Sequence, residues 1–211
     1  MKTYCTLFTL ATILFITSCR SEEKKYYRFM ENGDLIRPTD YRSWMFVGSA
    51  ATPKSLDSSA VFPDFQNIYI DPESYQFWKE NGYYREGTIF AKELMREGDS
   101  LSHIGRGFYQ GDFYSLAFTI KDTVRFPYAK GGWEYFDFTN FETLLLDETS
   151  AVLGVKGECF SCHNVNKDGQ GPYTEFYPIL LDAKNYGKGN PESKSERAGL
   201  DDTVKEFAGV D

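Results

Sequence analysis

Two cysteines and a histidine near the C-terminal end of the chain have a spacing that is suited to chemistry. Cys159 and Cys162 lie three positions apart, and His163 follows directly. This is the pattern of c-type haem attachment, in which two thiols form thioether bonds with the two vinyl groups of one porphyrin. The adjacent imidazole can then bind the iron as its proximal ligand. The sequence therefore predicts one covalent haem c, attached at Cys159 and Cys162 and ligated by His163.

Two other uses of the motif remain open. A zinc site needs three or four nitrogen or sulfur ligands, and outside the N-terminal segment the chain adds only His103 to the motif. A redox-active dithiol normally lies near a βαβ pattern, which this sequence lacks. Haem attachment accounts for the residues best.

The N-terminal segment predicts export. Lys2 supplies a positive start and Thr6–Ile16 an apolar core, so residues 1–18 form a signal peptide. The segment ends in a stretch that resembles a bacterial lipobox, which makes Cys19 a lipidated residue; an ordinary secretory signal is the alternative. Residues 19–25 then form a charged tether. We expect a protein anchored by lipid to a bacterial membrane, on the periplasmic side or at the cell surface.

Composition favours a single packed domain over residues 26–186, followed by a polar tail over 187–211. The 18 Phe and 15 Tyr residues provide an aromatic-rich core that needs no disulfides. The formal net charge is −8 and the sequence pI is about 4.9, without the concentrated basic patch that nucleic acid requires. An acidic surface suits a basic redox partner protein instead.

Periodicity and turn residues predict an α+β fold, with a mostly antiparallel sheet of four or five strands and flanking short helices around the haem. Asp71 is a residue type expected at a helix N-cap, and Pro72 is expected at the first helical position. Gly82 is expected just after the end of the helix. The expected strands are Trp44–Ala50, Gln66–Asp71, Gly87–Arg96, Asp112–Lys121 and Gly132–Phe138, and the expected helices are Pro72–Asn81, Cys159–His163 and Phe176–Tyr186.

The sixth position of the iron decides between gas or substrate binding and simple electron transfer. Met45 and Met95 lie in strand-like apolar runs, where core packing is expected. His103 lies in a loop rich in Gly and Ser, where a solvated side chain is expected, and Met30 is the other candidate. We therefore expect a five-coordinate, reactive iron.

Lys92 interrupts an apolar strand face. In a strand, Thr88, Phe90, Lys92 and Leu94 share one face. From the pattern alone, an edge or snorkelling lysine is the default, since a buried ammonium is costly unless it is paired or consumed.

The order of several short motifs resembles the cytochrome P460 family and the related cytochrome c-prime-beta. The matching segments cover nearly all of residues 26–184. They are Tyr41-Arg42-Ser43-Trp44, Ile68-Tyr69-Ile70-Asp71-Pro72-Glu73-Ser74-Tyr75, Gly87-Thr88, Lys92-Glu93-Leu94, Gly111-Asp112, Lys121-Asp122, Gly132-Trp133, the haem motif and Phe176-Tyr177-Pro178.

The resemblance implies a sheet with flanking helices around a c-haem, an aromatic-rich distal pocket and commonly a homodimer. In relatives of the P460 type, the lysine of the Lys-Glu-Leu segment is bonded to a meso carbon of the porphyrin, and the enzyme oxidises hydroxylamine. Lys92 occupies that position. The sequence departs from the pattern at Ala117, where active relatives are expected to carry an acid, and near Gln66, where a relative carries arginine. No catalytic base is therefore assigned.

Three functions follow from these residues. The first is oxidation of hydroxylamine or a related small nitrogen species at an open haem. The second is binding of nitric oxide or carbon monoxide, favoured by Phe-rich strands that include Phe90 and Phe118 as pocket candidates. The third is plain electron transfer, which would require a sixth protein ligand.

Overall fold

The structure, a computed structural model, describes residues 24–62, 64–154, 158–163 and 171–186. The predicted signal peptide 1–18, Cys19 and the tail 187–211 lie outside the described residues, as does most of the tether 19–25. No helix in the described part of the chain has the length and apolar character needed to cross a membrane.

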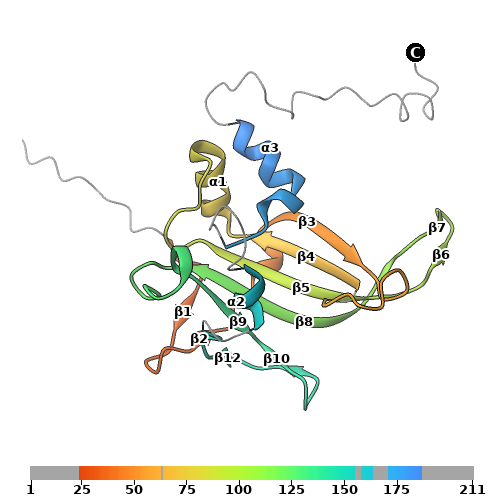
Figure 1. The fold of residues 1–211 in the computed structure, drawn as a ribbon, viewed down its shortest axis with the longest axis horizontal. Coiled ribbons are helices and arrows are strands. Elements are labelled where there is room, and N and C mark those ends of the chain that lie inside the picture. The colour runs from red at the N-terminus through yellow and green to blue at the C-terminus, as the bar shows by residue number, and fades with distance from the viewer. Residues whose placement is uncertain (1–23, 63, 155–157, 164–170, 187–211) are drawn as a thin grey trace, which may run out of the picture.

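A five-stranded sheet forms the centre of the fold (Figure 1). Its strands are β3 (Met45–Thr52), β4 (Asp64–Ile70), β5 (Ile89–Glu97), β8 (Gln110–Lys121) and β9 (Trp133–Asp137), in this spatial order. Every neighbouring pair is antiparallel. The predicted α+β class and the predicted strand number are confirmed.

Helix α1 (Pro72–Asn81) forms as its end signals predict. The Asp71 side chain accepts a hydrogen bond of 2.8 Å from the Ser74 amide, which satisfies one of the free N–H groups of the first turn. The helix ends at Gly82, whose φ of 74° is left-handed. Helix α3 (Pro178–Tyr186) lies beside α1 (Figure 1), and the Trp78 indole donates to the Leu180 carbonyl at 2.7 Å. Both helices cover one face of the sheet.

Short elements complete the fold. Apart from the motif helix α2, the sequence did not predict them, because two or three residues are too few to show a periodicity. They are β1 (Arg28–Phe29), β2 (Leu35–Ile36), β6 (Leu101–Ser102), β7 (Gly105–Arg106), β10 (Thr139–Asn140), β11 (Leu145–Leu146), β12 (Thr149–Ser150), α2 (Glu158–His163, the predicted motif helix) and 3₁₀ turns at Tyr41–Ser43, Lys130–Gly132 and Thr174–Phe176. The last of these turns explains why α3 begins at Pro178 rather than at the predicted Phe176.

Two hydrophobic cores lie on opposite faces of the sheet. The core under α1 and α3 contains Val47, Ile68, Ile70, Trp78, Tyr84, Phe90, Trp133, Leu180 and Ala183. The other core includes Ile89, Ala91, Phe118 and Phe136 together with N-terminal residues such as Tyr27 and Leu35. Because alternate residues of β5 enter different cores, Lys92 shares the face of Phe90, as the predicted alternation requires.

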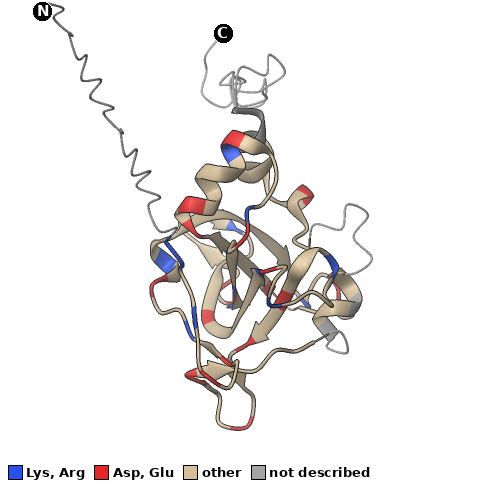
Figure 2. Ribbon diagram, turned by 90° about the vertical axis from the view of Figure 1, so that its left-hand side faces the viewer, with Lys and Arg blue, Asp and Glu red and all other residues tan. Residues whose placement is uncertain are grey.

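Charged residues are interspersed over the described part of the molecule. In the view of Figure 2, acidic and basic segments alternate, and no continuous basic stripe runs along the described ribbon.

Candidate haem-binding site

The haem motif lies on helix α2, against strand β9. Two hydrogen bonds fix the chain just before it: the Leu153 amide donates to the Tyr135 carbonyl and the Gly154 amide to Glu134 Oε1, each at 3.1 Å. Glu134 is fully buried, and its other oxygen accepts from the Tyr128 hydroxyl at 2.8 Å. The buried carboxylate thus ties the segment that leads into the motif to the sheet.

The His163 side chain is oriented as an iron ligand requires. Its Nδ1 lies 2.5 Å from the Gly171 carbonyl oxygen. A carbonyl can only accept, so Nδ1 carries the hydrogen and Nε2 of the neutral ring keeps the lone pair that binds a metal. The ring packs between Tyr135 and Tyr173, with centroid distances of 4.8 Å to each. Burial lowers the pKa of His163, which favours the neutral ligand form.

Gly171 can be only a glycine at this position. Its φ is +72°, and a Cβ would lie 2.5 Å from Cγ of Trp133. The backbone therefore approaches the indole closely enough to present its carbonyl to His163. Next along the chain, the Tyr173 hydroxyl donates to the Cys162 carbonyl at 2.6 Å, so both ends of the motif are held.

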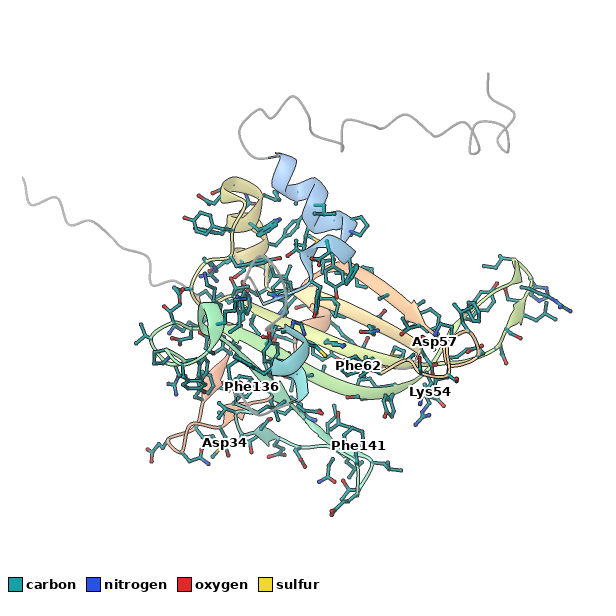
Figure 3. The ribbon with its side chains drawn as sticks, in the orientation of Figure 1. Asp34, Lys54, Asp57, Phe62, Phe136 and Phe141 are labelled. Atoms are coloured by element: carbon teal, nitrogen blue, oxygen red, sulfur yellow. The ribbon has the colours of Figure 1, made fainter. Side chains whose placement is uncertain are left out.

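Lys92 is close enough to the two cysteines of the motif to interact with them electrostatically. Burial is the dominant effect and lowers the pKa of Lys92 to about 8. The Nζ atom lies 3.4 Å from the centroid of the Phe62 ring, and no carboxylate among the described residues is within ion-pair distance of it. Figure 3 shows Phe62, from the loop between β3 and β4, lying over the sheet. The structure thus places an unpaired amine under an aromatic ring at the motif.

The two predicted pocket phenylalanines lie on different faces. Phe90 is on the Lys92 face, buried against Trp133 with ring centroids 6.1 Å apart. Phe118 packs against Trp44 and Phe138 in the opposite core, so the proposed site does not include it.

The predicted sixth-ligand candidates are far from the motif or turned away from it. His103 is exposed in the turn between β6 and β7, at the end of a hairpin that projects away from α2 (Figure 1). Met30 is exposed, and so is Met45, in contrast to the predicted core position. Met95 is opposite Phe65 and therefore on the other face of β5 from Lys92. None of these residues reaches the motif.

The residues of the motif fit a haem better than a metal ion held by protein alone. In the described part of the chain, no three His, Cys, Asp or Glu side chains lie close enough together to hold a metal ion. No disulfide joins Cys159 and Cys162, so both sulfur atoms can form thioethers, and burial raises the pKa of Cys159. A neutral imidazole with a fixed tautomer supplies the axial donor.

Sequence reasoning missed four residues of this site. The tertiary structure brings Tyr135 and Gly171 against His163 and Phe62 over Lys92. Asp137 interacts electrostatically with Lys92 and Cys159. The one available signal was the Gly171-Pro172-Tyr173 turn just after the motif, where a Gly-Pro pair indicates a tight backbone.

Comparison with known protein families agrees with this arrangement. The fold and site define a class of protein with a c-type haem motif laid against an antiparallel sheet. The sequence profile of the family described as Cytochrome P460 matches residues 38–174, and the chain belongs to this family. No curated protein matches the chain. Membership of the family implies that the protein binds haem.

Proposed function

We propose that the chain is a mono-haem c-type cytochrome whose haem is attached at Cys159 and Cys162, with His163 as the proximal ligand. The support is the orientation of His163 toward the Gly171 carbonyl and the position of both cysteines on one short helix, where no disulfide joins them. Export and lipidation at Cys19 belong to the same proposal, because c-type haem is attached outside the cytoplasm.

The activity that we propose is oxidation of hydroxylamine or a related small nitrogen species. The observation that carries this proposal is the buried Lys92 amine, which has no carboxylate partner among the described residues and is largely deprotonated above about pH 8. A free amine is a nucleophile, so it is suited to a covalent bond with the porphyrin. That bond replaces one hydrogen on nitrogen and one on carbon, and two electrons pass to an oxidant such as a peroxide.

The chain's own residues supply the rest of the site. Bound haem supplies an electron acceptor and an open coordination position. His163 holds the proximal side, and its hydrogen bond to Gly171 keeps the imidazole basic. Phe62 covers Lys92 and restricts water there, so a small uncharged molecule is favoured over a large or charged one.

Steady-state kinetics tests this proposal. Purified holoprotein should oxidise hydroxylamine when an artificial electron acceptor is present, and the rate should depend on both concentrations. A holoprotein that shows no turnover under these conditions would contradict the proposal.

Binding of nitric oxide or carbon monoxide is the second candidate. It is favoured by Ala117, which lies directly opposite Lys92 and offers an apolar methyl group where a carboxylate would assist proton transfer. Rapid mixing of ferrous holoprotein with nitric oxide tests it, and failure to bind would exclude it. Such binding without turnover of hydroxylamine would decide in favour of the gas-binding role.

A further inference from the structure

A row of four side chains crosses the sheet beside the haem motif. Ile68, Lys92, Ala117 and Asp137 lie directly opposite one another on β4, β5, β8 and β9. Directly paired residues of antiparallel strands point to the same face, so Asp137 shares the face of Lys92. Along this row, Ala117 is the residue between Lys92 and Asp137.

The Asp137 carboxylate is held in place but keeps one oxygen available. Its Oδ1 accepts a hydrogen bond of 2.8 Å from the Thr139 amide. No described residue donates a hydrogen bond to Oδ2, and no described cation is within ion-pair distance of the carboxylate. Asp137 is only partly buried, so water can reach it. Such a group can receive a proton and release it to solvent.

The charged groups that face Asp137 change when the haem is attached. From β5 the facing group is Lys92, from α2 it is Cys159, and β8 contributes only Ala117. A thioether sulfur carries no charge, and a lysine bonded to the porphyrin no longer carries an ammonium charge. Among these protein groups, Asp137 then keeps its negative charge.

We propose that Asp137 is the proton-accepting carboxylate of the haem site, in the role for which the sequence has no acid at position 117. The inference rests on the proposed function. As hydroxylamine gives up electrons, an N–H or O–H bond of the substrate breaks and an O–H bond forms on the carboxylate. The electrons leave through the haem to an external acceptor, and the carboxylic acid passes its proton to water.

The test compares Asp137→Asn with Asp147→Asn in the holoprotein. Asparagine at 137 keeps the oxygen that accepts from Thr139 but removes the charge. Asp147 is an exposed carboxylate that accepts only from Asn140, at 3.3 Å, so it serves as the matched control. The readout is the ferric–ferrous equilibrium against redox dyes, measured at neutral pH.

We expect Asp137→Asn to shift this equilibrium at neutral pH toward the ferrous form by about tenfold, because a nearby negative charge stabilises ferric iron. Asp147→Asn should leave the equilibrium at its wild-type position, because the charge of an exposed carboxylate is screened by solvent. An equilibrium in Asp137→Asn equal to that of the wild type would overturn the proposal. Absence of hydroxylamine turnover in the wild type would instead contradict the proposed function, and the redox measurement would still decide the role of Asp137.

Discussion

At the scale of single residues, the site depends on the environment of groups that the sequence already contains. Lys92 is the clearest case: its strand position follows from alternation, but its chemistry follows from Phe62 and from the absence of a carboxylate partner among the described residues. Desolvation favours the neutral amine, so the pKa falls from 10.5 to about 8.

The lowered pKa of Lys92 predicts a measurable pH profile. In chain produced without haem, acylation of Lys92 should reach half its maximal rate near pH 8, because the ammonium is unreactive and is lost as the pH rises through that value. Peptide mass spectrometry measures the modification. In Phe62→Ala the amine is hydrated, and the midpoint should move toward 10.5. A wild-type midpoint near 10.5 would show that the amine is not buried.

Gly171 gives a second prediction at the residue scale. Gly171→Ala brings a Cβ within 2.5 Å of Trp133 and displaces the carbonyl that orients His163. We expect a fall of about 2–4 kcal/mol in the free energy of unfolding and a roughly 10- to 100-fold weaker iron–histidine bond, measured by denaturant unfolding and by acid displacement of the ligand.

Gly154→Ala is the matched control for this change. Gly154 also has a left-handed φ, of +64°, but a Cβ there meets nothing within 4 Å. Gly154→Ala should lower the free energy of unfolding by about 1 kcal/mol, from the backbone conformation alone. Iron ligation should be unchanged. Equal effects of the two substitutions would refute a special role for the Gly171 carbonyl.

At the scale of elements, the long strands and α1 could be predicted and the positions of the loops could not. Alternation over β5 and β8, and the capping residues of α1, are local signals that the chain carries in consecutive positions. The approach of Phe62 to Lys92 joins residues thirty positions apart across a loop, which no local pattern encodes. Phe118 was predicted near the haem because the sequence does not show which face of the sheet carries the motif. In the structure its side chain lies in the opposite core.

The hydrogen bonds of Glu134 join strand β9 to the segment before α2 and lead to a prediction at the scale of elements. Glu134→Ala removes the acceptor of the Tyr128 hydroxyl and the Gly154 amide and leaves both donors without it. We expect a loss of roughly 2–3 kcal/mol in the free energy of unfolding and faster hydrogen exchange at the Gly154 amide. Glu142→Ala, at an exposed carboxylate, should change neither quantity. Unaltered hydrogen exchange at the Gly154 amide in Glu134→Ala would contradict this role of Glu134.

At the scale of the whole molecule, the two faces of the sheet have different roles. One face, with Phe118 and Phe136, is a packed core that Tyr27 and Leu35 complete. The other face carries α1 and α3 at one part and the haem motif at another. From α2, Phe160 packs against the core that contains Phe118, so the motif helix is anchored to the fold. The family match over residues 38–174 spans both faces and the motif.

The most direct test of the account examines the haem and its link to Lys92 together. We would record the absorption spectrum of ferrous holoprotein and the mass of its haem peptide, in the wild type and in Lys92→Ala. The account predicts a strongly red-shifted Soret band, and a cross-linked peptide lighter by two hydrogen atoms than the sum of its parts; both features should be lost in Lys92→Ala. An ordinary five-coordinate c-haem spectrum in both proteins would contradict the link, and a holoprotein without covalent haem would contradict the site itself.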